Sequence, residues 1–201
     1  MKGGIPVEEE KRSKLRAIEL WDLGLLRPEK SGTVEELMRI HEYLFRDLFS
    51  FAGKIRTVNL SKGNFRFVPV LFLEENLKII ERMPQTTWDE IVEKYVEMNV
   101  AHPFREGNGR ATRIWLDEIL KAELGVCVDW SKVDKESYLS AMERSPVNPL
   151  ELKTLLYAAL TEETENREVY LRGIASSYRY ENLDRVDIFE LDQKKGASNH
   201  D

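Results

Sequence analysis

The segment His102–Arg113, with the sequence HPFREGNGRATR, is the part of the chain that is richest in functional groups. Pro103 predicts the end of a preceding helix, because the residue before a proline is disfavoured in the α conformation. The imidazole of His102 would then be free to face a cleft. The glycines on both sides of Asn108 permit backbone conformations that larger residues resist. A second helix is expected to begin near Gly109, so that exposed backbone N–H groups at its start would form an anion site.

Charged side chains surround this predicted anion site. Arg110 and Arg113 are three residues apart and therefore project from the same side of the first helical turn. Glu106 places one carboxylate beside the site, as a Mg²⁺ ion that bridges phosphates requires. A base, a metal ligand, an anion site and two arginines together indicate phosphoryl or nucleotidyl transfer. The chain contains neither a G-x-x-x-x-G-K-[ST] motif nor a dinucleotide fingerprint at this segment.

Outward from this segment, helical periodicity dominates the sequence. Capping-box patterns at Thr33 and Thr87 predict two helix starts. Further helices are expected at about 8–24, 72–82, 134–143, 149–160 and 165–179. Residues 54–70, KIRTVNLSKGNFRFVPV, alternate between apolar and polar around a turn and predict a β-hairpin. The fold class is therefore expected to be all-α with one small β-hairpin.

Length and composition limit the classes of protein that fit. A chain of 201 residues with 42% hydrophobic content favours one domain over residues 1–201. The formal net charge of −6 disfavours a general nucleic-acid binder. No apolar run predicts a membrane span or a signal peptide, and one cysteine allows no intramolecular disulfide. A cytoplasmic protein without direct contact to nucleic acid or membrane is expected. The mixed charges of Glu8–Lys14 indicate a solvated face, and the polar residues 185–201 a loose tail.

The segment His102–Arg113 matches the motif H-x-F-x-[D/E]-G-N-G-R-x-x-R at every fixed position, and the chain resembles Fic-domain proteins over residues about 15–183. The resemblance implies AMPylation, the transfer of AMP from ATP to a Tyr, Ser or Thr hydroxyl of a target protein. It implies that His102 is the general base and that Glu106 holds Mg²⁺, with Mn²⁺ as an alternative. A histidine that titrates near neutrality would suit this proton removal. The residues that the resemblance assigns to the ATP phosphates are Gly107, Asn108, Gly109, Arg110 and Arg113.

A second motif of the same family, [S/T]-x-x-x-E-[G/N], fits the sequence SYRYEN at residues 177–182. Its specified positions are Ser177, Glu181 and Asn182. The resemblance is to the family class with a C-terminal inhibitory helix, here at about 165–182. It implies that Glu181 pairs with Arg113 and withdraws this arginine from the γ-phosphate, while Ser177 holds the helix end. Removal of AMP from the modified target stays open as a second activity. Self-modification at Tyr178 or Tyr180, which flank Glu181, is a hypothesis for how the inhibition is released.

The hairpin resembles the flap that docks target proteins in this family, and backbone pairing with a target strand is expected there. The predicted docking residues are Lys62, Gly63, Asn64, Phe65, Arg66 and Phe67. The target is undetermined, and a type II topoisomerase subunit is the first candidate by analogy. Association into a homo-oligomer that masks the C-terminal helix would fit a concentration-sensitive inhibition.

Two alternatives to AMPylation remain. One is a kinase-like Fic relative that transfers the γ-phosphoryl group, and the other is a non-enzymatic adaptor that keeps the fold. His41 begins half of a zincin motif but lies on the apolar face of its helix, so a core histidine is favoured. Cys127 is interpreted as a small buried residue and not as a nucleophile.

Overall fold

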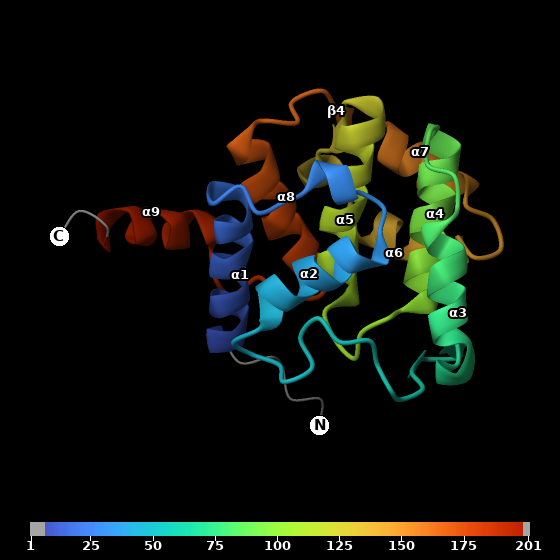
Figure 1. The fold of residues 1–201 in the computed structure, drawn as a ribbon. Coiled ribbons are helices and arrows are strands. Elements are labelled where there is room, and N and C mark those ends of the chain that lie inside the picture. Colours follow the sequence, from blue (N-terminus) through green and yellow to red (C-terminus); the bar gives the residue numbers. More distant parts are fainter. Residues whose placement is uncertain (1–6, 199–201) are drawn as a thin grey trace.

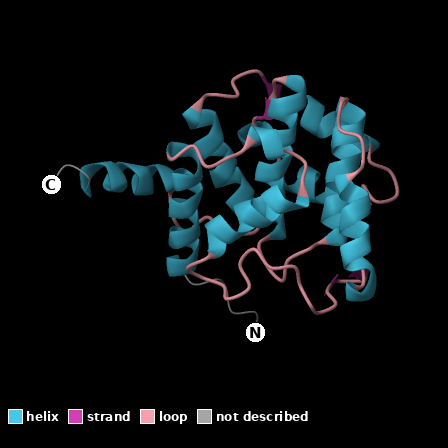
Figure 2. Ribbon diagram, viewed as in Figure 1, coloured by secondary structure: helices cyan, strands magenta, loops and turns pink. Residues whose placement is uncertain are grey.

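The structure is a computed structural model and describes residues 7–198 of the chain. It is mainly helical, as Figures 1 and 2 show. Its helices are α1 (Val7–Asp22), α2 (Val34–Phe45), α3 (Val70–Glu81), α4 (Trp88–Ala101), α5 (Asn108–Leu124), α6 (Lys135–Arg144), α7 (Leu150–Tyr157), α8 (Arg167–Tyr180) and α9 (Ile188–Ser198). Short 3₁₀ helices cover Pro28–Lys30 and Trp130–Lys132. The predicted all-α class with a small hairpin is confirmed.

The strands are shorter than the sequence pattern predicted. In the hairpin, β1 (Ser61–Lys62) pairs antiparallel with β2 (Phe65–Arg66), and the rest of residues 54–70 is irregular apart from the start of α3. A second antiparallel pair joins β3 (Cys127–Val128) to β4 (Leu160–Thr161). Sequence periodicity missed this second pair because two-residue strands are too short to produce an alternating pattern.

Helix α5 is the central element of the fold, with α3 and α4 on one side and α1 and α8 on the other (Figure 1). Its middle is buried on all sides, and Trp115, Leu116, Ile119 and Leu120 are each 0% exposed. The helix begins after Gly107, which has a φ of +79°. A Cβ atom at this position would lie 2.5 Å from the Phe45 ring, so α2 can pack against the start of α5 only because this residue is glycine.

The two predicted helix starts are present. The Thr33 hydroxyl accepts a hydrogen bond from the Glu36 amide at 3.1 Å, at the start of α2. Thr87 and Glu90 form a complete capping box at the start of α4. Each cap satisfies backbone N–H groups that the helix itself leaves without a partner.

The C-terminal region differs from the expected loose tail. Residues 188–198 form α9, which extends away from the body of the molecule (Figure 1). Ile188 and Leu191 lie one helical turn apart and are 1% and 6% exposed. Arg167 of α8 pairs with Asp22 of α1 at 2.8 Å and with Asp192 of α9 at 2.6 Å. The prediction is therefore wrong for residues 188–198, and residues 199–201 lie outside the described residues.

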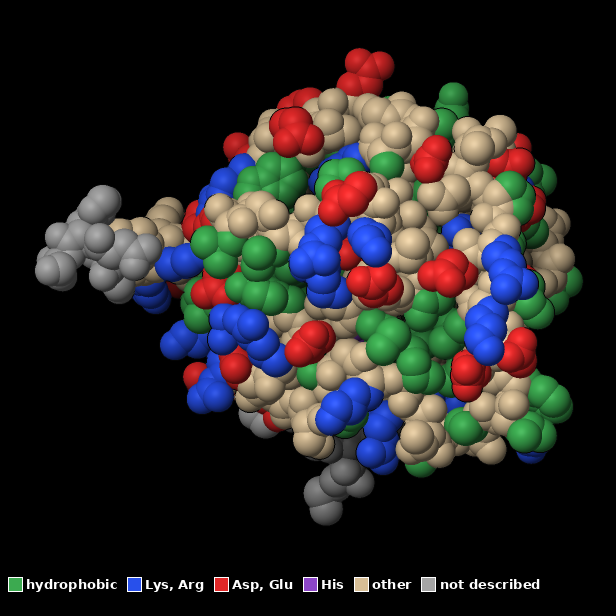
Figure 3. Space-filling model, in the orientation of Figure 1, with side chains coloured by type: hydrophobic (Ala, Val, Ile, Leu, Met, Phe, Trp, Pro, Cys, Tyr) green, Lys and Arg blue, Asp and Glu red, His purple; other side chains and the backbone are tan. Residues whose placement is uncertain are grey.

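Acidic and basic side chains are interspersed on the face drawn in Figure 3, and no broad basic surface covers that face. Within residues 7–198, no helix combines the length and the apolar character that crossing a bilayer requires.

Candidate active site

The predicted catalytic loop comprises residues 102–113, and its non-helical part, residues 102–107, connects α4 to α5 with His102 at its start. Helix α4 ends at Ala101, one residue before the backbone of His102 turns into the left-handed region with a φ of +50°. The imidazole ring of His102 stacks on the ring of Phe67, which belongs to the hairpin that resembles the family's flap, and the two ring centroids are 3.7 Å apart. Burial, followed by the positive charge of Arg56, lowers the pKa of His102 to about 4. The expectation of titration near neutrality is therefore wrong, and the imidazole is neutral throughout the physiological range.

Core side chains pack against the loop and hold its backbone in place. Phe104 is 0% exposed and stacks on the His41 ring, with centroids 3.7 Å apart. His41 Nε2 donates to the Glu106 carbonyl at 2.8 Å, and its Nδ1 accepts from the Gly53 amide at 2.9 Å. Burial lowers the pKa of His41 to about 4. His41 is therefore a core histidine, as predicted, and it also fixes the loop, a function that the sequence did not indicate.

Asn108 braces the same loop. Its Oδ1 accepts from the Phe104 amide and its Nδ2 donates to the Phe104 carbonyl, both at 2.8 Å. The side chain of Asn108 is thereby committed to the protein backbone. What Asn108 can offer an anion is its backbone N–H at the first position of α5.

The start of α5 is built to receive an anion. No side chain caps it, since its N-cap is Gly107, and the first N–H groups of a helix have no intrahelical partner. Glu106 Oε1 accepts from the Gly107 amide at 3.0 Å and lies 3.2 Å from Arg110 Nη2. The Glu106 side chain is 51% exposed, so its carboxylate faces solvent beside the helix start.

A metal ion bound at Glu106 would need further ligands. Residues 7–198 contain no cluster of three or more His, Cys, Asp or Glu side chains that could hold one. Mg²⁺ commonly binds through one or two carboxylates together with substrate phosphates and water, and a single exposed carboxylate beside an anion site fits that pattern.

The two arginines of the motif both contact Glu181, which follows α8. Arg110 Nε lies 2.8 Å from Glu181 Oε2, and Arg113 Nη2 lies 3.0 Å from Oε1. Both guanidinium groups are buried, with Arg110 and Arg113 2% and 4% exposed. Burial alone would raise the pKa of Glu181, but the two arginines overcome this effect and hold it below its ordinary value. The pair with Arg113 was expected, whereas the sequence did not indicate the pair with Arg110.

Glu181 also occupies the start of α5. A Cβ atom at Gly109 would lie 2.6 Å from Glu181 Oε1 and 2.9 Å from Arg113 Nη1. The absent side chain of Gly109 therefore leaves the space in which the carboxylate sits. Glu181 thus lies where the sequence predicts an anion, with the groups predicted to bind that anion around it.

The other residues of the second motif lie around the end of α8. Ser177 Oγ accepts from Arg113 Nε at 2.7 Å, and the Ser177 carbonyl accepts from Arg113 Nη2 at 2.8 Å. Asn182 has a φ of +60°, and its Oδ1 accepts from Lys135 Nζ at 2.5 Å. Both residues therefore help to fix the segment that carries Glu181.

Tyr178 and Tyr180 are core residues, 1% and 4% exposed. The Tyr180 hydroxyl donates towards the carbonyls of Trp130 and Val133 at 2.9 and 2.8 Å. Neither hydroxyl can reach a second molecule while α8 is folded. The hypothesis of self-modification at these positions is thus contradicted for the folded state, because the sequence pattern could not show that both rings pack inward.

The predicted docking residues of the flap divide into two groups. Residues 62–66 are exposed, and β1 and β2 form a two-stranded sheet with no further strand among the described residues. Phe67 is partly buried against the His102 ring. The flap therefore lies beside the imidazole and contributes an aromatic wall to it. Sequence reasoning also missed Arg56, a buried arginine behind His102; its one signal was a charged residue among the alternating apolar residues of KIRTV.

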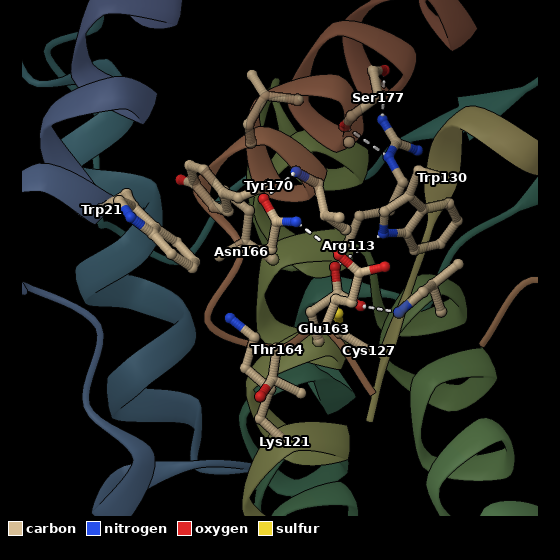
Figure 4. Close-up of a pocket in the computed structure, with 16 residues that line it drawn as sticks. Trp21, Arg113, Lys121, Cys127, Trp130, Glu163, Thr164, Asn166, Tyr170 and Ser177 are labelled. Carbon is tan, nitrogen blue, oxygen red and sulfur yellow. Dashed lines mark hydrogen bonds between the residues drawn. The ribbon is translucent and has the colours of Figure 1, made fainter. Parts of the chain in front are cut away.

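A small cavity lies behind Arg113, between α5 and α8 (Figure 4). Its volume of about 30 Å³ suits roughly one water molecule, so it cannot hold a nucleotide. Asp117 accepts from the Val128 amide and from Trp130 Nε1 there, and burial raises its pKa to about 7. Cys127 is 5% exposed and burial raises its pKa to about 12, which agrees with a small buried residue.

Known proteins are similar to this chain in the part of the sequence that forms this site. The profile of the Fic/DOC family matches residues 31–120, which include the catalytic loop. Protein adenylyltransferase VbhT of Bartonella schoenbuchensis is 27% identical over 94% of this chain, which spans 41% of that protein. A protein of Escherichia coli K12 named probable protein adenylyltransferase Fic is 24% identical over 84% of this chain and 90% of its own length.

Two solved structures share the fold. BepC of Bartonella tribocorum, crystallised with AMPPNP, has a TM-score of 0.64 at 21% identity and covers 80% of this chain and 90% of its own. The FIC domain of Bep8 from Bartonella sp. 1-1C has a TM-score of 0.67 at 20% identity, with coverage of 78% and 85%. With the complete motif on the loop between α4 and α5, residues 31–120 of this chain match the Fic/DOC family, and the chain shares the fold of solved Fic domains.

Proposed function

We propose that this protein is an adenylyltransferase that moves AMP from ATP to a hydroxyl side chain of a target protein, and that its own Glu181 restrains the reaction. The observation that carries the proposal is the position of the Glu181 carboxylate at the start of α5, between Arg110 and Arg113. A site that attracts one carboxylate with two guanidinium groups and a helix N-terminus is suited to a phosphate chain.

The reaction uses the residues around the loop as follows. Neutral His102 accepts the proton of the target hydroxyl, and the hydroxyl oxygen attacks the α-phosphorus of ATP. The bond from this phosphorus to the oxygen that bridges to the β-phosphate breaks, and diphosphate leaves. Arg110, Arg113 and the N–H groups at the start of α5 stabilise the negative charge that develops on the leaving group. Mg²⁺ or Mn²⁺ at Glu106 would neutralise further phosphate charge.

The inhibition follows from competition for the same cations. Glu181 is part of the chain, so its effective concentration at the arginines is high. ATP can bind productively only when it displaces this carboxylate. A coupling free energy of about 1–3 kcal/mol between the two would lower activity by roughly 5–150-fold.

Label transfer tests the proposal. The wild type, Glu181→Gly and the double variant His102→Ala/Glu181→Gly are incubated with Mg²⁺, a bacterial lysate as the source of targets, and ATP labelled at the α- or γ-phosphate. We expect α-label on protein, roughly 5–150-fold more in Glu181→Gly than in the wild type, and none in the double variant. Glu165→Gly, in the exposed turn before α8, is the matched control and should behave like the wild type.

Other outcomes separate the alternatives. Transfer of the γ-label indicates the kinase-like reaction, and no transfer by Glu181→Gly indicates an adaptor. Equal α-label transfer by the wild type and Glu181→Gly would show that Glu181 does not inhibit. A purified type II topoisomerase subunit added to the lysate tests the first target candidate.

A further inference from the structure

We propose that Arg56 is the positioning residue of this site, which holds His102 in its active orientation and ties both ends of the flap to the catalytic loop. The inference rests on the proposed function, in which His102 is the base. Arg56 lies in the segment between α2 and the flap, and neither the motif nor the comparisons assign it a role.

Arg56 is a buried cation without a carboxylate partner. It is 2% exposed, and no Asp or Glu among residues 7–198 forms an ion pair with it. Its guanidinium instead donates to four backbone carbonyls, those of Val58, Val68, Ala101 and His102. A buried charge is tolerated only when hydrogen bonds replace its hydration, so these four carbonyls are a requirement of the fold at this point.

Two of the four bonds fix the backbone of His102. Arg56 Nη2 donates to the Ala101 carbonyl at 3.0 Å, and Nε donates to the His102 carbonyl at 2.7 Å. The Arg56 amide donates to the Pro103 carbonyl at 2.8 Å. These carbonyls lie at the C-terminal end of α4, where the helix dipole is negative and a cation is favoured. His102 can therefore keep a left-handed conformation, which residues other than glycine rarely adopt.

The other two bonds hold the flap. Arg56 Nη1 donates to the Val58 carbonyl at 2.8 Å, before β1, and Nη2 donates to the Val68 carbonyl, after β2. The Val68 amide donates to the Val100 carbonyl of α4 at 3.2 Å. Phe67, the neighbour of Val68, is the residue that stacks on the His102 ring. One guanidinium thus joins the base and the flap that would present the target hydroxyl to it.

If Arg56 had only a structural function, its substitution would lower the stability of the fold and would not specifically change the titration of His102. Positioning by this cation predicts an electrostatic effect as well. The charged groups that act on the imidazole are Arg56, Lys62 of β1 and Glu181 after α8, together with the Asn99 carbonyl of α4. Arg56 and Lys62 lower the pKa of His102, whereas Glu181 and the carbonyl raise it. Loss of the Arg56 charge must therefore move the titration of His102 to higher pH.

The test compares Arg56→Lys and Arg56→Met in the Glu181→Gly background. A lysine keeps the charge but cannot reach four carbonyls in fork geometry. We expect kcat for adenylyl transfer to fall about 10- to 100-fold in both variants, with KM for ATP changed less than about twofold, because misplacing a catalytic group lowers the rate of the chemical step. The acidic limb of the kcat profile should move to higher pH in Arg56→Met and stay in place in Arg56→Lys. Arg82→Met, at the exposed end of α3, is the control.

A second readout does not depend on activity. The chain has three histidines, so NMR titration of the imidazoles is simple, and His102→Ala assigns the resonance of interest. The pKa of His102 should be higher in Arg56→Met than in Arg56→Lys. Equal titration in the two variants, or a fall in kcat matched by a rise in KM for ATP, overturns the inference. If Glu181→Gly transfers no label, the proposed function has failed, and the NMR titration still decides the function of Arg56.

Discussion

The imidazole of His102 combines a low pKa with a fixed position. Burial and then Arg56 lower its pKa to about 4, so at neutral pH nearly every molecule holds the form that can accept a proton. The cost is weaker basicity, because a group of lower pKa accepts a proton less readily in the transition state. Under the proposed mechanism, charge neutralisation at Arg110, Arg113 and the start of α5 would then contribute much of the rate.

The pH profile of the released enzyme is predicted from this value. Under the proposed mechanism, activity requires neutral His102, so it is lost as the pH falls through the pKa of the imidazole. In Glu181→Gly the limb should lie at or below about pH 4, and not near 6.5, because loss of Glu181 removes a charge that raises this pKa. Initial rates of α-label transfer from pH 5 to 8 should therefore be nearly flat, with circular dichroism as the check on folding. A decline centred near pH 6.5 would contradict the prediction.

At the scale of single residues, the sequence predicted which loop residues lie together, because they are neighbours in the chain. The ion pair between Arg113 and Glu181 is present, as the second motif predicted. Arg56 is 45 residues from Ala101 along the chain, and its bonds depend on how α4 packs against the flap. No local pattern records such a contact.

Among the elements, α1 holds the end of α8 in place. Lys14 of α1 is 2% exposed and donates to Glu10 at 2.6 Å, and to the carbonyls of Val186 and Leu183 at 2.7 and 3.2 Å. The Val186 amide donates back to Glu10 at 3.0 Å. The expected solvated face at Glu8–Lys14 is therefore wrong for this pair, which is buried over the chain that follows Glu181.

Removing the charge of Lys14 should weaken the inhibition. Lys14→Met leaves the Glu10 carboxylate buried without a cation, a change that typically costs about 3–5 kcal/mol. The segment after Glu181 is its immediate neighbour, so we expect adenylyl transfer to rise towards the level of Glu181→Gly. The measurement is α-label transfer at a temperature where both proteins are folded.

The control for this change is Lys11→Met, which removes an exposed lysine of the same helix and should leave the rate unchanged. In the Glu181→Gly background, Lys14→Met should give no further increase. A folded Lys14→Met protein with the basal rate of the wild type would show that α1 does not contribute to the inhibition.

At the scale of the whole molecule, the first turn of α9 packs on the folded body, and the rest of this helix extends away from it. Arg167 joins α8 to both α1 and α9, and Ile188 and Leu191 are buried at the base of α9. The sequence could not indicate this helix, because two apolar residues one turn apart within a polar stretch give too short a periodic signal. These two side chains are buried because α9 packs against α1 in the folded protein.

The stability of α9 can be measured directly. Leu191→Ala removes a side chain that is 6% exposed and should lower the free energy of unfolding by about 2 kcal/mol. Gln193→Ala changes an exposed residue of the same helix and should stay within about 0.5 kcal/mol of the wild type. Urea denaturation followed by circular dichroism gives both values. Equal stability of the two variants would mean that α9 does not pack in solution.

Glu181 is the C-cap residue of α8, with a φ of −100°, and not a residue of its interior. Helix ends open locally with much less free energy than global unfolding requires. Under the proposed inhibition, unwinding the last turn is enough to free the arginines, and the rest of α8 can stay folded. The basal rate of the wild type divided by that of Glu181→Gly then equals the population of this open end. If the wild-type rate is one hundredth of the Glu181→Gly rate, the free energy of opening is about 2.7 kcal/mol. Hydrogen exchange at the amides of 178–183 would report this free energy independently.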